Sequence, residues 1–153
     1  MLFRSGIKDC LLPEDALIPF LSLRLEQPVK WIEDRQENLL TYHGRGMSLD
    51  VEAAVKSDGT FLGIRVKIVA DLGAYFYFTS PFPLFNAARR ITGPYRVPAV
   101  HAQLLGVITN KPPTPAYRGT GSPEPPFCIQ PTLHPTPHHL GLDPSAVPPP
   151  HHV

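Results

Sequence analysis

The sequence predicts an α+β fold, with a mixed or antiparallel sheet that contains a β-hairpin and is flanked by two helices. Residues 47–55 and 62–70 alternate apolar and polar side chains on either side of a Ser-Asp-Gly turn, as expected for paired strands with one buried face. A helix-like segment precedes them, and a further strand-like run at 99–109 follows. At 153 residues the chain is long enough for one domain with a hydrophobic core.

The first expected element is a helix that begins at Pro13. Proline suits the first turn of a helix, and the carboxylates of Glu14 and Asp15 complement the positive end of the helix dipole. Apolar side chains then recur at helical spacing, and Pro19 is expected to bend the helix.

Three further segments follow this helix along the chain. Residues 29–33, Val-Lys-Trp-Ile-Glu, predict a short strand in which Trp31 packs rather than stacks on a ligand. Residues 43–46 predict a loop, and the hairpin at 47–70 carries its charged side chains on a solvated face.

Aromatic side chains gather after the hairpin. Core packing explains such a cluster best, and the alternative is that some of the rings form the wall of a substrate funnel. The aromatic residues are Tyr75, Phe76, Tyr77, Phe78, Phe82 and Phe85.

The candidate ligand-binding segment is the loop Ala-Tyr-Arg-Gly-Thr-Gly at residues 116–121, which follows the predicted strand 99–109. Gly119 and Gly121 can adopt positive φ and have no Cβ that would hold a ligand away. Arg118 supplies a planar cation suited to oxyanions, and prolines before it restrict the loop. The alternative is an ordinary surface turn with one solvated arginine.

The composition argues against several classes of partner. A net charge of +1 and an isoelectric point near 7.9 provide no basic field for nucleic acid. Cys10 and Cys128 lack the C-x-x-C spacing of a zinc site and do not form a disulfide framework. Because the sequence has neither an apolar run of about 18 residues nor a signal-peptide pattern, we expect no membrane partner and a cytoplasmic location.

The end of the chain differs in composition from the rest. Of the 20 prolines, 13 follow Lys111, and five of the seven histidines lie in residues 134–153. The proline density from Gln130 onward predicts no stable helix. Residues 128–153 are therefore expected to be a disordered Pro/His-rich tail. The alternative, which the family resemblance described below implies, is a corrupted read of a helical segment. Read literally, such a tail could bind an SH3-type domain or an adventitious metal ion.

Several stretches share a pattern when they are taken together and in order. They are GIKDCLLPEDALIPFLSLRLEQPVKWIEDRQENLL (6–40), VKIVADLGAYF (66–76), TGPYRVPAVHAQLLGVITNKPPTPAYRG (92–119) and, more weakly, LGLDPSAV (140–147). This set resembles the molybdopterin-binding large subunit of the xanthine dehydrogenase, aldehyde oxidase and aerobic carbon monoxide dehydrogenase family. The resemblance implies that residues 6–127 are part of a molybdopterin-binding domain. Residues 1–5, MLFRS, match nothing in the family and are expected to be a non-native scar.

The resemblance also implies a set of site residues and a helix at 83–90. The residues expected to bind the cofactor are Arg118, Gly119, Gly121 and Gly6. Those expected to meet the substrate are Thr120, Asn86 and Asp9. Purine-oxidising members carry an arginine where this chain has Asn86, which argues against a purine substrate. Carbon monoxide oxidisers carry a reactive cysteine in the loop, and no cysteine stands beside Thr120.

The implied activity is oxidative hydroxylation of an aldehyde or N-heterocycle at a molybdenum–molybdopterin centre, expected in its cytosine dinucleotide form. FAD and [2Fe-2S] clusters are expected on partner subunits of the same complex. The general-base glutamate of the family lies outside this chain, so no catalytic residue or metal ligand is assigned here, and the chain alone is expected to be inactive. Two alternatives are a non-catalytic α+β binding module and an interaction protein that works through the proline-rich tail.

Overall fold

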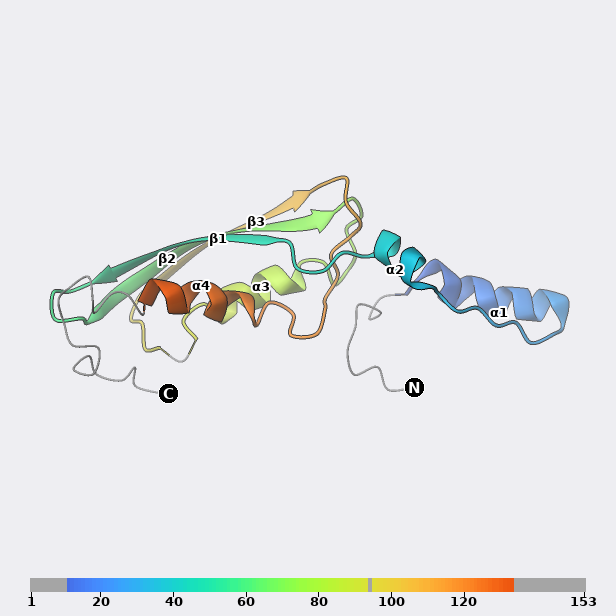
Figure 1. The fold of residues 1–153 in the computed structure, drawn as a ribbon, viewed down its shortest axis with the longest axis horizontal. Coiled ribbons are helices and arrows are strands. Elements are labelled where there is room, and N and C mark those ends of the chain that lie inside the picture. Colours follow the sequence, from blue (N-terminus) through green and yellow to red (C-terminus); the bar gives the residue numbers. More distant parts are fainter. Residues whose placement is uncertain (1–10, 94, 134–153) are drawn as a thin grey trace.

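The computed structural model describes residues 11–93 and 95–133, so the predicted scar at 1–5 and most of the predicted tail lie outside the described residues. The described part confirms an α+β fold with a mixed three-stranded sheet (Figure 1). The elements in order are α1 (Pro13–Leu25), α2 (Arg35–Thr41), β1 (Met47–Val55), β2 (Phe61–Gly73), α3 (Phe82–Arg89), β3 (Val100–Ile108) and α4 (Glu124–Leu133).

The sheet has the order β1-β2-β3. β1 and β2 form the predicted antiparallel hairpin, in which Met47 lies opposite Ala70, and the turn between them is closed by a hydrogen bond of 2.9 Å from the Lys56 N–H to the Thr60 carbonyl. The predicted strand at 99–109 is confirmed as β3, which pairs with the other edge of β2 in parallel. β2 is therefore the central strand, and β1 and β3 are the two edges.

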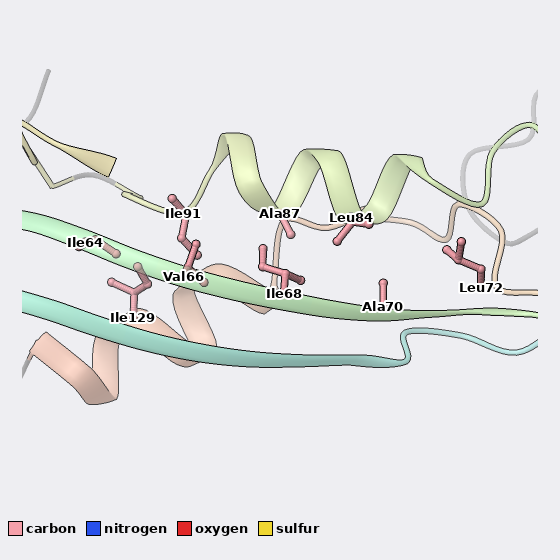
Figure 2. Packing of buried hydrophobic residues seen from close by; sticks show 9 residues of the cluster. All are labelled: Ile64, Val66, Ile68, Ala70, Leu72, Leu84, Ala87, Ile91 and Ile129. Carbon is pink, nitrogen blue, oxygen red and sulfur yellow. The ribbon is translucent and has the colours of Figure 1, made fainter. Parts of the chain in front are cut away.

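One face of β2 forms the core. Alternate side chains of this strand are buried because a strand presents every second residue to the same face. Helices α3 and α4 cover this face, and Figure 2 shows their side chains pointing toward the strand. The buried cluster consists of Ile64, Val66, Ile68, Ala70 and Leu72 from β2, Leu84, Ala87 and Ile91 from α3 and the residues after it, and Ile129 from α4.

Helix α3 confirms the helix expected at 83–90 to within one residue at each end. Helix α4 corrects the expectation that no helix continues beyond Gln130, because it extends to Leu133. Pro125 and Pro126 lie in its first turn, where backbone N–H groups have no helical partner to lose. Pro131 lies inside the helix and removes only one backbone hydrogen bond, while Ile129, which is 2% exposed, packs into the core.

The N-terminal helices lie beyond one end of the sheet (Figure 1). α1 begins at Pro13 as predicted, and Asp15 accepts a hydrogen bond of 2.9 Å from the Leu12 N–H. α2 is capped by Asp34, which accepts from the Glu37 N–H at 2.8 Å, while Glu37 accepts from the Asp34 N–H at 2.9 Å. Neither helix buries a residue.

The strand predicted at 29–33 is wrong, because these residues form no strand in the structure. A short β-prone run becomes a strand only when another strand pairs with it, and no strand of the described residues does so here. Trp31, which the sequence placed in the packing, is 40% exposed.

The aromatic residues after β2 also differ from expectation. Tyr75, Phe76, Phe78 and Phe85 are exposed, and the aliphatic side chains of β2 and α3 fill the core in their place. Phe78 does pack on Phe82 edge to face, with ring centres 5.5 Å apart. The prediction of core packing is therefore wrong for most of this cluster. The alternative, that some of the rings form the wall of a substrate funnel, stays a prediction.

Helices long and apolar enough to cross a membrane do not occur in the described segments.

Candidate functional site

The predicted loop at 116–121 consists of two successive tight turns. The Thr120 N–H donates to the Tyr117 carbonyl at 2.7 Å, and the Ser122 N–H donates to the Gly119 carbonyl at 2.8 Å. Three consecutive residues have positive φ, which is 94° at Gly119, 28° at Thr120 and 75° at Gly121. Such a φ at a β-branched threonine costs on the order of 1–3 kcal/mol, and strain of this kind is concentrated at functional sites.

The two glycines also have a packing role that the sequence did not reveal. A Cβ on Gly121 would lie 2.0 Å from the carbonyl oxygen of Pro83 and 2.7 Å from the nitrogen of Ala87, so the loop packs directly on the backbone of α3. A Cβ on Gly119 would lie 3.2 Å from a guanidinium nitrogen of Arg45. The shape of the loop therefore depends on both glycines, and their contact with a cofactor stays a prediction.

Asp71, near the end of β2, holds the segment that leads into the loop. Its Oδ1 accepts hydrogen bonds from the Thr109 hydroxyl at 2.6 Å and the Gly73 N–H at 2.9 Å. Its Oδ2 lies 3.2 Å from the ammonium of Lys111, and its carbonyl accepts from the Thr114 hydroxyl. The end of β2 is thereby tied to the chain that leaves β3.

These contacts set the ionisation of Asp71. Burial is the largest single influence and opposes ionisation, but the hydrogen bonds from Thr109 and Gly73, together with Lys111, lower the pKa of Asp71 below its usual value. Because the pKa is lower in the folded chain than in the unfolded chain, the carboxylate stabilises the fold fully above about pH 4. That contribution is lost as the pH falls through the folded-state pKa.

Replacement of Asp71 with asparagine is expected to lower the free energy of unfolding at pH 7 by about 1–3 kcal/mol, because the Lys111 partner and a charged acceptor are lost. The same variant should show a weaker pH dependence of stability between about pH 5 and pH 2. Urea unfolding at several pH values measures both effects. Lys111→Gln, which removes only an ion pair whose lysine side chain is 60% exposed, should cost less than about 1 kcal/mol. If the stability of Asp71→Asn depended on pH as steeply as that of the wild type, the stabilising role assigned to the ionised Asp71 carboxylate would be contradicted.

A small hollow lies between the start of β1, the end of β2 and the loop. Its lining includes Arg45, Asp71, Tyr117, Thr120 and Glu124. The structure thus brings two of the predicted site residues, Thr120 and Gly121, to this hollow. Arg118, Gly119 and Asn86 are not part of its lining.

The remaining predicted residues have different positions. Asn86 is half-buried on α3, between the two residues whose backbones meet Gly121. Gly6 and Asp9 lie outside the described residues.

The donors of the loop fit an anionic or oxygen-rich ligand. Arg118 is exposed, and its guanidinium forms no ion pair or hydrogen bond with any residue that the structure describes. Within the same residues, the backbone N–H groups of Arg118, Gly119 and Gly121 donate no hydrogen bond. A free planar cation beside free N–H groups in a turn is an arrangement that binds anions. Residues 11–93 and 95–133 contain no group of three or more His, Cys, Asp and Glu side chains that could hold a metal ion directly.

Arg45 is the residue of this site that the sequence did not reveal. Its Nη1 lies 3.2 Å from Oε1 of Glu124, its Nη2 donates to the Arg118 carbonyl, and its guanidinium lies 5.2 Å from the centre of the Tyr117 ring. The partners are more than 70 positions away along the chain, so no local pattern points to them. The second oxygen of Glu124, Oε2, is buried and has no hydrogen-bond partner among the described residues.

The chain is similar to known proteins over most of its length. A family model described as molybdopterin cofactor-binding domain matches residues 6–148. Subunit gamma of the 6-hydroxypseudooxynicotine dehydrogenase complex of Paenarthrobacter nicotinovorans is 39% identical over 123 residues, which is 80% of this chain and 16% of that protein. The carbon monoxide dehydrogenase large chain of Hydrogenophaga pseudoflava is 43% identical over 97 residues, which is 60% of this chain and 12% of that protein.

A solved structure shows the same fold. Quinoline 2-oxidoreductase from Pseudomonas putida 86 superposes with a TM-score of 0.82 and 36% identity, and the match covers 95% of this chain and 19% of that one. The chain therefore spans less than a fifth of the length of these relatives. The resemblance indicated by the sequence motifs is confirmed, and the chain belongs to the molybdopterin-binding large subunits of the molybdenum hydroxylase family.

Proposed function

We propose that the chain is a segment of the large subunit of a molybdenum hydroxylase and that the complete subunit oxidatively hydroxylates an N-heterocycle. The observation that carries the proposal is the strained loop at 117–121, which presents Arg118 and unpaired N–H groups within a domain whose family binds molybdopterin. An aldehyde is the other substrate class that the sequence left open. N-heterocycles are favoured because relatives of this chain are named for quinoline and nicotine.

The bound group would supply the redox chemistry, and the residues of this chain would hold and orient it. Arg118 and the N–H groups of Gly119 and Gly121 are proposed to bind the molybdenum–molybdopterin cofactor, in its cytosine dinucleotide form. Thr120, which lines the hollow, is proposed to face the substrate together with Asn86. The binding of the cofactor by Gly6 and the contact of Asp9 with the substrate stay predictions.

The rest of the catalytic machinery is proposed to lie outside this segment. FAD and [2Fe-2S] clusters on partner subunits would carry the electrons away, and a glutamate elsewhere in the complete subunit would act as general base. The segment alone is then inactive. A cytoplasmic location stays a prediction.

Carbon monoxide is not the proposed substrate. Carbon monoxide dehydrogenase large chains are among the relatives, but residues 116–121 contain no cysteine. A purine is not proposed either, since Asn86 lacks the positive charge that the family uses to bind one.

Replacement of Arg118 with alanine in the complete subunit, produced with its partner subunits, is expected to weaken cofactor binding by about 10-fold to 100-fold, because a charge-assisted contact is lost. Metal analysis and pterin release measure the cofactor content, and a panel of quinolines, pyridines and aldehydes measures turnover. Arg65→Ala is the matched control, because that side chain is 72% exposed and pairs only with Glu52 in the described part. Unchanged molybdenum content in Arg118→Ala would contradict the proposed contact. A full cofactor content in the unaltered complex with no turnover on any substrate would favour the non-catalytic binding module.

A further inference from the structure

Arg45 is held in place on both sides along the chain. The His43 N–H donates to the Pro113 carbonyl at 3.0 Å, and the Asp71 N–H donates to the Gly46 carbonyl at 2.7 Å. Between these anchors Arg45 has a φ of 51°, a left-handed conformation that a residue with a Cβ adopts only when the surrounding structure maintains it. The start of the guanidinium side chain is therefore fixed relative to the sheet.

The far end of the side chain is fixed as well. Glu124 is the first residue of α4, its side chain is only 12% exposed, and its carboxylate pairs with the guanidinium. The Tyr117 ring lies under the same group. A planar fork can serve a carboxylate, a carbonyl and an aromatic face at once, whereas a lysine ammonium is a single point charge.

The contact with the Arg118 carbonyl has a directional consequence. In a planar trans peptide the C=O of one residue and the N–H of the next point in opposite directions. Because Arg45 engages the carbonyl of Arg118, the N–H of Gly119 points away from Arg45. This N–H donates to none of the described residues, so the contact with Arg45 fixes the direction of a free donor.

We propose that Arg45 is a positioning residue of the cofactor loop, which orients the Arg118–Gly119 peptide so that its N–H faces the bound group. The inference rests on the proposed function of that loop, and it adds a residue that does not itself touch the cofactor. Glu124 acts one step further away by holding the guanidinium.

Trypsin offers a readout that does not depend on activity, since it cleaves the Arg118–Gly119 bond itself. In the complete subunit freed of cofactor, Arg45→Ala is expected to accelerate cleavage at this bond about 10-fold or more, because an anchored loop must open before it is cut. The loaded Arg45→Ala enzyme should also retain less molybdenum and show lower turnover per bound molybdenum. The cleavage rate of Arg45→Lys should lie between those of Arg45→Ala and the wild type. Arg65→Ala should be cleaved at the wild-type rate.

The possible results separate the two proposals. Unchanged cleavage in Arg45→Ala overturns the positioning role and leaves the Arg118→Ala test of the cofactor contact standing. Faster cleavage with unchanged molybdenum content and turnover also overturns it, because Arg45 would then only stabilise the loop. If Arg118→Ala retains its molybdenum, the proposed contact of the Arg118 side chain fails. The role of Arg45 concerns the backbone N–H of Gly119, so it is decided by the cleavage rate and molybdenum content of Arg45→Ala.

A second variant, Glu124→Gln, tests the same contact if Arg45→Ala does not fold. Glu124→Gln preserves the size of the side chain and an oxygen acceptor but removes the charge that holds the guanidinium. It is expected to accelerate cleavage by about threefold to tenfold. Wild-type cleavage in a folded Glu124→Gln subunit would contradict the proposed hold of Glu124 on Arg45.

Discussion

Replacement of Gly121 with alanine is expected to destabilise the chain by at least about 3 kcal/mol, because the clash with α3 adds to the cost of a positive φ. The new Cβ would lie 2.0 Å from the Pro83 carbonyl oxygen, and φ at this position is 75°. Neither the loop nor α3 can give way easily, since the atoms that collide belong to the backbone. Urea unfolding followed by circular dichroism measures the loss.

Gly44 provides the matched control for this substitution. A Cβ on Gly44 would meet nothing within 4 Å, and Gly44 is not among the positive-φ glycines. Gly44→Ala should therefore change the free energy of unfolding by no more than about 0.5 kcal/mol. If Gly121→Ala behaved like Gly44→Ala, the packing of the loop on α3 would be wrong.

Replacement of Ile68 with alanine is expected to cost about 2–5 kcal/mol, since it opens a cavity at the centre of the core. Ile68 is 0% exposed and lies in the cluster that joins β2 to α3 and α4. Because the cluster includes residues of both helices, the amide hydrogens of α3 and α4 should exchange faster as the global stability falls.

Leu62→Ala on the same strand is the control for the core variant. This leucine is 47% exposed, so its truncation removes less buried area and should cost less than about 1 kcal/mol. Equal losses in the two variants, measured by urea unfolding, would contradict the assignment of the core to one face of β2.

Local patterns in the sequence predicted most of the fold. The hairpin followed from alternation at 47–55 and 62–70, because one face of each strand is buried and the other is not. The start of α1 followed from Pro13 and the carboxylates after it. β3 was identified as a strand, but its parallel pairing with β2 depends on the path of the chain through α3 and not on any local signal.

Some elements were missed because tertiary contacts decide them. Residues 29–33 have strand propensity but no partner strand in the described part. α4 tolerates Pro131 because Ile129 is buried in the core, which offsets one lost hydrogen bond. Helix α2 was missed for a different reason: the Asp34-x-x-Glu37 capping box is a local signal in the sequence, but it was not used.

The candidate site was predicted only in part. The loop at 116–121 was located from its glycines and from Arg118, and the structure adds the strained backbone of Thr120. Arg45 and the contact of Gly121 with α3 could not be read from the sequence, because each joins segments that are distant along the chain.

The position of β3 at the edge of the sheet bears on how the chain behaves by itself. Val100, Leu105, Val107 and Ile108 are 39–58% exposed along this nine-residue strand, and no other strand of the described residues pairs with its outer side. An open, apolar edge of this length is a template for intermolecular strand addition. Isolated copies of this chain are therefore expected to aggregate through β3.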